Sequence, residues 1–255
     1  MKKRFKVASV QLKLGKTPTT ILKNIKKYLG VAKKQGVEIV CFPEYSLNAG
    51  PRKNEKMLRI VAEECNTLKI WCILSGKLKE KKHTYNSAVL INANGEISGK
   101  HRKVHICDDP PIKAGSSFEN FDTPFGKIGI AICWDVAFPE SIFSIAKQGA
   151  KLIFCPMFWE YDSWSHLQSP KKYEKRILKS LILTRAYENL SYFVFCNPYD
   201  PKTPSLTSYS AIAEPHKIIS DIFDREGMIV GEVNMHYLDQ MRRRYSRSYS
   251  KKISA

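Results

Sequence analysis

Apolar positions recur along the chain with two different spacings, which predict strands in some segments and helices in others. Alternating or continuous short apolar runs predict strands at 5–14, 37–43, 70–78, 84–92, 97–106, 127–133, 151–156, 192–197, 208–213 and 227–233. Helical spacing predicts helices at 18–34, 54–68, 139–147, 171–189 and, near the end, 235–244. Strands and helices alternate at first, and hairpin-like runs follow. This order predicts an α/β fold in which a mixed sheet carries helices on its outside.

A short repeat indicates where a site would form. The segment QGVEIVCFPE at 35–44 aligns without a gap with QGAKLIFCPM at 148–157. In each copy a glycine suits the left-handed end of a helix, and a proline closes the strand that follows. The copies deliver Glu44 and Met157 to strand ends, and Cys133 also ends a strand. Ligands gather at the carboxyl ends of strands in open α/β sheets, so we expect these three residues to face one pocket.

The chain of 255 residues has no linker or low-complexity segment, so we expect a single domain over 1–255 with a basic tail near 241–255. No apolar run approaches the roughly 20 residues that cross a bilayer. The first residues do not resemble a signal peptide, because MKKRF leads directly into an alternating stretch. We therefore expect a soluble, cytoplasmic protein without a membrane partner.

The charge of the chain is strongly positive, with 42 Lys and Arg against 24 Asp and Glu and a net charge of +18. Such a charge raises nonspecific affinity for nucleic acid, and tyrosines in the tail at 241–252 could stack on bases. The basic residues are nevertheless spread along the chain, and no nucleic-acid-binding motif accompanies the tail. We favour a solvated terminal helix or a subunit contact, and nucleic acid is not an expected partner.

Cysteine usage leaves room for a reactive thiol. Seven cysteines are dispersed along the chain without a CxxC pair, so neither a zinc site nor a disulfide framework is expected. Cys133 ends the run KIGIAIC, and Pro139 in the following WDVAFPE suits the first turn of a helix. A tight strand-to-helix turn can expose a nucleophile and aim the next backbone N–H, that of Trp134, at an oxyanion. Core packing is the alternative for such a cysteine.

Two charged residues could assist this thiol, and we expect Cys133 to be the most reactive of the seven. Glu44 follows an apolar strand and a proline, where a partly desolvated carboxylate could accept the thiol proton; a helix cap is the alternative. Lys103 lies in KHRKVHI, where alternation places it on one strand face with His101 and His105. A lysine there would lower the thiol pKa and stabilise an oxyanion; an ordinary basic edge strand is the alternative.

Three segments read in order resemble the nitrilase superfamily of carbon–nitrogen hydrolases, in its amidase and carbamoylase-like branch. They are CFPEYS at 41–46, HRKVHI at 101–106 and AICWDVAFPE at 131–140. The resemblance implies a four-layer α-β-β-α sandwich, a homo-oligomer and a reaction without metal or organic cofactor. It also implies a catalytic triad with a Glu base, a Lys that stabilises the oxyanion and a Cys nucleophile. These roles fall on Glu44, Lys103 and Cys133.

The implied reaction is hydrolysis of a small-molecule amide or N-carbamoyl amine through a covalent cysteine acyl-enzyme. Two alternatives keep the same fold and nucleophile, namely nitrile hydrolysis and acyl transfer to an amine. A third comes from another class of protein: a basic binding protein whose inherited site is idle. The intact set of Glu, Lys and Cys motifs argues against the third.

Two departures from the family pattern concern the substrate. Many relatives carry a second Glu seven residues ahead of a Gly, and counting back from Gly115 reaches Asp108, with Asp109 as a rival. We expect Asp108 to assist catalysis; a polar turn is the alternative. Ala137 stands where such enzymes often have a carboxylate-binding Arg. From this position we expect a neutral or cationic substrate.

An aromatic loop at 157–166 follows the second copy of the repeat and could form a wall of the pocket. We expect the side chains of Met157, Phe158 and Trp159, together with Trp134, to contact the substrate. An oligomer contact or a satellite core cluster is the alternative for this loop.

Overall fold

The computed structural model describes residues 2–107, 111–161 and 170–249. Its helices are α1 (Pro18–Lys34), α2 (Pro51–Leu68), α3 (Pro139–Lys147), α4 (Pro170–Glu188) and α5 (Met235–Tyr249), with a 3₁₀ helix η1 (Cys133–Ala137). Its strands are β1 (Arg4–Gln11), β2 (Val37–Cys41), β3 (Trp71–Glu80), β4 (His83–Ile91), β5 (Ile97–Arg102), β6 (Asn120–Thr123), β7 (Gly126–Ile130), β8 (Leu152–Pro156), β9 (Tyr192–Cys196), β10 (Tyr209–Glu214), β11 (Lys217–Phe223) and β12 (Gly227–Asn234).

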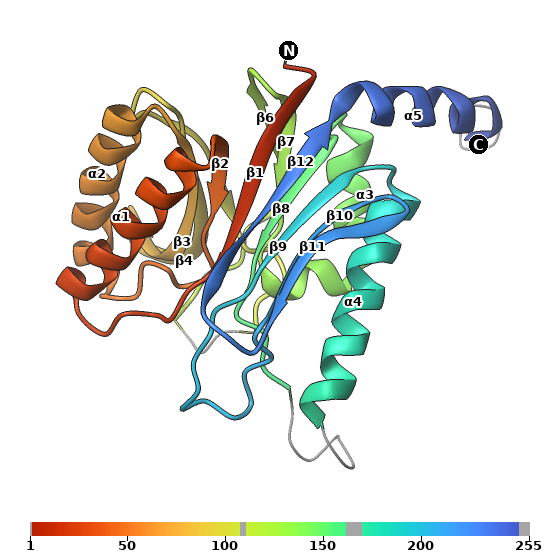
Figure 1. Cartoon of the computed structure of the whole chain (residues 1–255). Coiled ribbons are helices and arrows are strands. Elements are labelled where there is room, and N and C mark those ends of the chain that lie inside the picture. Colours follow the sequence, from red (N-terminus) through yellow and green to blue (C-terminus); the bar gives the residue numbers. More distant parts are fainter. Residues whose placement is uncertain (1, 108–110, 162–169, 250–255) are drawn as a thin grey trace.

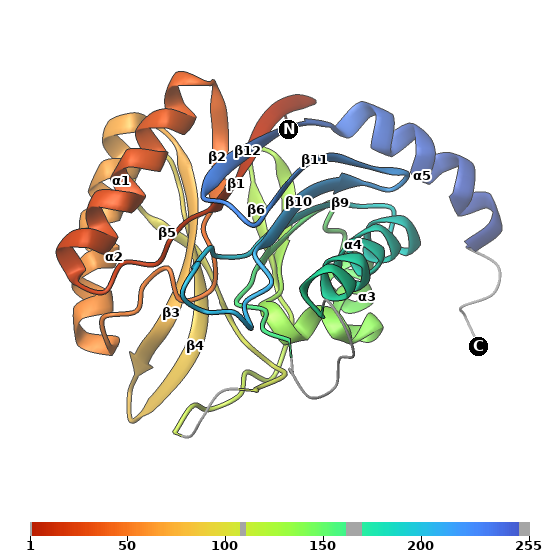
Figure 2. The same cartoon turned by 60° about the horizontal axis from the view of Figure 1, so that its bottom comes forward.

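The described strands form two six-stranded sheets, which explains the mixture of alternating and continuous apolar runs. Their orders are β12-β1-β2-β3-β4-β5 and β11-β10-β9-β8-β7-β6. The sheets face each other in the middle of the molecule, with α1 and α2 outside the first and α3 and α4 outside the second (Figures 1 and 2). This confirms the predicted α/β fold and the four-layer α-β-β-α sandwich.

The buried faces follow from side-chain alternation along the strands. In β2, Ile39 and Cys41 pack in the core between the sheets, whereas Val40 packs beneath α1 and α2. Polar side chains also cross between the sheets: Ser9 Oγ donates to the carbonyl of Phe195 at 3.0 Å. Both faces of the central strands are therefore covered, and the Ser9 hydroxyl is paired across the interface between the sheets.

The predicted helices are present, and the strands missed by sequence patterning are the two edges of the second sheet. These are β6 and β11. β6 is only 4 residues long, and most residues of β11 are partly or fully exposed. Since an edge strand needs no continuous apolar face, its sequence pattern is weak. The predicted strand at 97–106 ends early, at Arg102.

The repeat has the structure that its sequence predicts. Each copy is a helix, a glycine with positive φ and a strand: Gly36 has φ 71° and Gly149 has φ 101°. The strands β2 and β8 lie in different sheets. Their carboxyl ends nevertheless meet, because the N–H of Glu44 donates to the carbonyl of Met157 at 3.0 Å. The ends of the two copies therefore lie together between the two sheets.

The basic C-terminal segment forms α5, which extends beyond the second sheet (Figure 1). Met235, Leu238 and Met241 bury one side of its first turns, whereas Tyr237 and Tyr245 are exposed. Among the described residues, none of the helices is both long enough and apolar enough to cross a membrane.

Candidate active site

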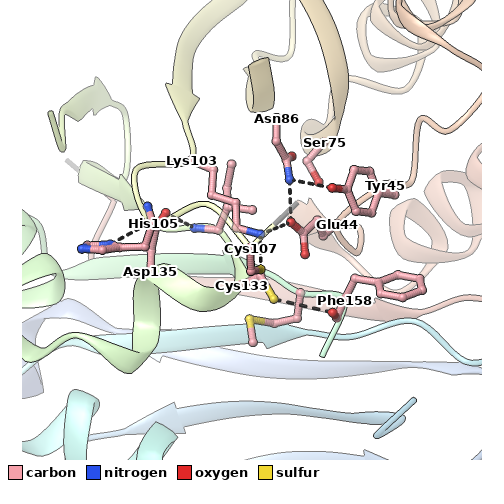
Figure 3. A network of polar contacts seen from close by, with 12 residues as sticks. Glu44, Tyr45, Ser75, Asn86, Lys103, His105, Cys107, Cys133, Asp135 and Phe158 are labelled. Atoms are coloured by element: carbon pink, nitrogen blue, oxygen red, sulfur yellow. Dashed lines mark hydrogen bonds and ion pairs between the residues drawn. The ribbon is translucent and has the colours of Figure 1, made fainter. Parts of the chain in front are cut away.

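Glu44, Lys103 and Cys133 come together at the ends of strands from both sheets (Figure 3). Glu44 follows β2, Lys103 follows β5 and Cys133 follows β7. The Nζ of Lys103 lies 2.9 Å from the Oε1 of Glu44, and both residues are 1% exposed. The structure thus gathers the three residues that the sequence predicts as a triad.

The Glu44 carboxylate is almost fully buried and is held by two donors. Besides Lys103, Asn86 donates from Nδ2 to Oε1 at 2.7 Å, and Nδ2 also contacts the Tyr45 hydroxyl at 3.1 Å. Burial by itself lowers the pKa of Lys103, but the Glu44 carboxylate and the thiols of Cys133 and Cys107 together outweigh burial and raise that pKa above its ordinary value. Lys103 therefore stays cationic, and the buried charges compensate each other.

Cys133 occupies a tight turn between β7 and η1. Its φ is 46°, a left-handed conformation that is uncommon for a residue with a side chain and costs of order 1–3 kcal/mol. Its Sγ lies 3.6 Å from the carbonyl oxygen of Phe158. The predicted strand-to-helix turn is present, although η1 separates the cysteine from α3.

Asp135, which the sequence argument did not single out, joins the nucleophile turn to the segment after β5. Its fully buried carboxylate accepts from the backbone N–H of Ile132 at 3.0 Å, of Val104 at 3.1 Å and of His105 at 2.8 Å. The imidazole of His101 lies 3.3 Å away. Burial favours a higher pKa for Asp135, but the neighbouring His101 and these backbone hydrogen bonds outweigh burial and lower the pKa. In the sequence, the only sign of this role is that Asp135 stands two residues after Cys133.

The expectation that His101, Lys103 and His105 share one strand face is wrong, because β5 ends at Arg102. Beyond that point the chain turns so that Lys103 reaches Glu44, while both imidazoles lie against Asp135. The backbone N–H of Lys103 still donates to the carbonyl of Asn86 at 2.9 Å. This bond anchors the lysine beside its partner.

A second thiol, that of Cys107, lies beside the three predicted residues. Its Sγ is 3.3 Å from the Nζ of Lys103, and it is exposed, whereas Cys133 is buried. A hydrogen bond with Cys133, reinforced by the Lys103 charge, outweighs burial and lowers the pKa of Cys107 to about 6. The same hydrogen bond, burial and Glu44 raise the pKa of Cys133. These contacts favour the thiolate of Cys107 over that of Cys133, and the expectation that Cys133 is the most reactive cysteine stays a prediction.

A cavity of about 530 Å³ lies beside Glu44, Lys103 and Cys107. Its walls include Glu44, Lys103, Cys107 and Phe158, with Lys77 and Glu160 as further charged residues. Such a volume suits a small organic molecule. The described residues contain no group of three or more His, Cys, Asp and Glu side chains with the spacing of a metal site.

The residues predicted to contact substrate lie in different environments. Phe158 lines the cavity, and its ring centroid is 6.0 Å from that of Tyr45. Met157 points the opposite way: its side chain is fully buried and its sulfur contacts Cys155 at 3.2 Å. Alternation at the end of β8 explains this difference, and the contribution of Met157 to the cavity is its carbonyl contact with Glu44.

Trp134 and Trp159 lie against each other, with ring centroids 5.3 Å apart. Trp134 is 41% exposed, whereas Trp159 is 8% exposed and donates from its indole nitrogen to Glu174 at 2.6 Å. Neither ring is part of the wall of the cavity described above. Asp108 and its rival Asp109 lie outside the described residues.

Comparisons with known proteins agree with this arrangement. The family model for carbon-nitrogen hydrolases matches residues 6–243. The chain is 25% identical to omega-amidase NIT2-A of Xenopus laevis over 94% of this chain and 92% of that protein. It is 26% identical to omega-amidase NIT3 of Saccharomyces cerevisiae over 79% and 72% of the two chains.

Solved structures show the same fold. The crystal structure of a carbon-nitrogen hydrolase from Helicobacter pylori G27 superimposes with a TM-score of 0.86 at 19% identity, covering 98% of this chain and 96% of that one. Saccharomyces cerevisiae Nit3, a member of branch 10 of the nitrilase superfamily, gives a TM-score of 0.80 at 20% identity over 100% and 97% of the two chains. Because the family model spans nearly the whole chain, this protein belongs to the carbon-nitrogen hydrolase family.

Proposed function

We propose that the chain hydrolyses a small-molecule amide or N-carbamoyl amine through a covalent acyl-enzyme on Cys133. The observation that carries the proposal is the buried pair of Glu44 and Lys103, joined at 2.9 Å beside the Cys133 turn and open to a cavity of about 530 Å³. A base, a cation and a nucleophile at one cavity are the requirements of acyl transfer to a thiol.

In the acylation step, Glu44 takes the proton of the Cys133 thiol as sulfur attacks the carbonyl carbon. A base is needed because the raised pKa of Cys133 keeps this thiol protonated at rest. The ammonium of Lys103 and the backbone N–H of Trp134 stabilise the oxyanion that forms. Donors of this kind are commonly worth about 10²–10³-fold in rate.

In the second half of the reaction, the leaving ammonia or amine takes the proton back from Glu44. Water then attacks the thioester while Glu44 accepts one of its protons, and the acid product leaves as the Cys133 thiol is restored. Asn86 and the carbonyl of Met157 hold Glu44 in place through both steps, since they bind its carboxylate and its backbone N–H respectively. Positioning of this kind lowers the entropic cost of the reaction.

Amide hydrolysis is favoured over nitrile hydrolysis, acyl transfer and an idle site, because several relatives are named omega-amidases. Nitrile hydrolysis and acyl transfer would use the same thiol and differ in the product. An idle binding protein would have no need for a buried ion pair, which is expensive to maintain without a function. We also propose a cytoplasmic enzyme, consistent with seven free cysteines.

We further propose that the enzyme is a homo-oligomer that associates through its outer helices. The exposed face of α4 carries Tyr173 and Ile177, which are 51% and 50% exposed, and Phe143 on α3 is 45% exposed. Large apolar side chains gathered on one side of a protein are typical of a contact surface.

The test of the function is a screen of amides, N-carbamoyl amines and nitriles for release of ammonia, with product identification by mass spectrometry. We expect turnover of an amide or carbamoyl amine that is lost in Cys133→Ala. Cys65→Ala serves as the matched control, because Cys65 is buried in α2 away from the site. Turnover of nitriles alone, or equal ammonia release by Cys133→Ala, would reject the proposal.

A further inference from the structure

Two thiols lie together beside the cavity, and hydrolysis uses only one of them. Cys107 and Cys133 share a hydrogen bond, and Cys107 also lies 3.3 Å from the Nζ of Lys103. Figure 3 shows these three side chains gathered beside Glu44. Contact between thiols from segments far apart in the sequence is the first requirement for a disulfide.

The two thiols differ in access. Cys107 is exposed and lines the cavity, whereas Cys133 is 4% exposed and lies behind it. A small oxidant that enters the cavity therefore meets Cys107 first. Lys103 and the neighbouring thiol lower the pKa of Cys107 to about 6, so this sulfur is a thiolate at neutral pH. Exposed thiolates beside a second cysteine are the groups that peroxides oxidise selectively.

We propose that Cys107 and Cys133 are a redox modification site, at which a hydroperoxide converts the two thiols into a reversible intramolecular disulfide. The bond occupies the sulfur that attacks the substrate, so the oxidised enzyme is inactive and the reduced enzyme regains its activity. It also protects Cys133 from irreversible oxidation. This site goes beyond hydrolysis, which does not use Cys107.

The chemistry needs only a hydroperoxide such as hydrogen peroxide. The Cys107 thiolate attacks one peroxide oxygen, the O–O bond breaks, and hydroxide leaves and takes a proton to become water. Cys133 then gives its proton to Glu44, and its thiolate attacks the sulfur of the Cys107 sulfenic acid. A second hydroxide leaves and recovers that proton as water. Two thiols have lost two electrons and two protons, and one peroxide has become two waters.

The chain contains a matched control pair. Cys65 and Cys72 also share a thiol hydrogen bond, but both are fully buried, and burial raises the pKa of Cys72 well above its ordinary value. This pair has thiol contact without access to the cavity, and burial disfavours the thiolate of Cys72. We therefore expect no disulfide between Cys65 and Cys72 in the folded protein.

The experiment treats the reduced full-length protein with stoichiometric hydrogen peroxide, blocks free thiols, and maps peptides without reduction by mass spectrometry. We expect a cross-linked pair of peptides containing Cys107 and Cys133, two hydrogens lighter than their sum, and none for Cys65 with Cys72. Dithiothreitol should remove the cross-link and restore most of the activity. The cross-link is read by mass, so this result does not depend on which substrate, if any, the enzyme hydrolyses.

Cys107→Ser tests the role of the second thiol, with Cys65→Ser as its control and activities expressed relative to each untreated variant. In Cys107→Ser, peroxide should inactivate the enzyme without recovery in dithiothreitol, and Cys133 should appear as sulfinic acid. Cys65→Ser should behave like the parent. If Cys107→Ser does not fold, the presence or absence of the cross-link in the parent protein still tests the proposal. A parent that forms no cross-link between Cys107 and Cys133 would overturn the proposal, whether or not Cys133 is oxidised further.

Discussion

The backbone N–H of Glu44 donates a hydrogen bond to the carbonyl oxygen of Met157 at 3.0 Å, and this bond joins the ends of two equivalent αβ units. One unit ends β2 in the first sheet, and the other ends β8 in the second sheet. The same repeat therefore supplies the carboxylate from one side and the backbone acceptor that orients it from the other. The proposed base is positioned by elements of both sheets, which ties its geometry to the packing of the whole sandwich.

Glu44→Gln should keep the fold and lower kcat by at least about 100-fold, because the amide can still accept from Lys103 and Asn86 but cannot take the thiol proton. Glu160→Gln is the control, since this carboxylate lines the same cavity on its exposed side. The measurement is steady-state turnover together with the melting temperature of each variant. Turnover close to that of the parent in a folded Glu44→Gln protein would contradict the role of Glu44.

Asp135→Asn should destabilise the protein by roughly 3–5 kcal/mol, because an amide nitrogen would face buried N–H donors that now meet a carboxylate. The lowered pKa of Asp135 also predicts a pH dependence. This group stabilises the fold above its unfolded pKa of about 4, and the contribution disappears as pH falls through the lower folded pKa. Urea unfolding between pH 6 and pH 2 measures both effects.

The control for this series is Asp122→Asn, which makes the same change at an exposed position of the edge strand β6. We expect Asp122→Asn to unfold at nearly the parent urea midpoint at each pH. The loss of stability below about pH 4 should be smaller in Asp135→Asn than in the parent, since the titrating group is gone. Identical pH dependence in Asp135→Asn and the parent would exclude Asp135 as its source.

Iodoacetamide should label Cys107 before Cys133 in the native protein. The labelling rate should rise with pH around the Cys107 pKa of about 6 and level off above it, because the thiolate is the reacting species. Peptide mass spectrometry at short times identifies the site, and Cys65 should stay unlabelled until the protein unfolds. A midpoint near the ordinary thiol pKa of about 8.5 would show that Lys103 does not activate this cysteine.

The oligomer proposal predicts that Ile177→Glu dissociates the assembly, because a charge would be buried in an apolar contact. Lys172→Glu is the control: it introduces the same residue on the same helix at a position that is already charged and exposed. Sedimentation velocity gives the mass of each variant. A monomeric parent, or an Ile177→Glu protein that keeps the mass of an oligomeric parent, would contradict this surface.

Much of the architecture follows from local patterns, since the helix at 18–34 and the repeat ending in Glu44 are both present as predicted. The closeness of Glu44, Lys103 and Cys133 was predicted through family motifs, and their catalytic roles remain predictions. Other features depend on contacts between distant segments, which no local pattern encodes. Cys107 resembles any loop cysteine until Lys103 and Cys133 surround it.

The expectation drawn from position 137 also depended on contacts between distant segments, which the sequence does not show. Ala137 led to the expectation of a neutral or cationic substrate, but the backbone carbonyl of Ala137 is bound by the buried guanidinium of Arg185 at 3.1 Å. A different cation, Lys77 on β3, lines the cavity. Its place in the largely buried strand β3 gave no sign in the sequence that its side chain lines a cavity. Ala137 is not among the residues that line the cavity, so the expectation drawn from it stays a prediction, and Lys77 gives a separate ground for a charge preference.

We expect amides that carry a carboxylate at the far end to be preferred over neutral analogues, with Lys77 as the group that binds this end. Lys103 is already compensated by Glu44, whereas the Nζ of Lys77 lies 5.6 Å from the centroid of the Tyr45 ring at the wall of the cavity. A charge-assisted contact with a carboxylate contributes about 1.5–3 kcal/mol, which corresponds to at least about 10-fold in kcat/KM.

The test compares Lys77→Gln and Glu160→Gln on two amides that differ only in a terminal carboxylate or its neutral amide. Lys77→Gln should lower kcat/KM about 10-fold for the carboxylate substrate and change the neutral one little, because only the first loses a charged partner. Glu160→Gln should act in the opposite direction on the carboxylate substrate, since it removes a negative charge from the same cavity. Moderate salt screens the electrostatic field of the other basic residues beyond roughly 8–10 Å. A difference in kcat/KM between the two substrates that persists at moderate salt therefore comes from contacts within the cavity. Equal losses on both substrates in Lys77→Gln would assign Lys77 to the structure of the wall and return the substrate preference to a neutral amide.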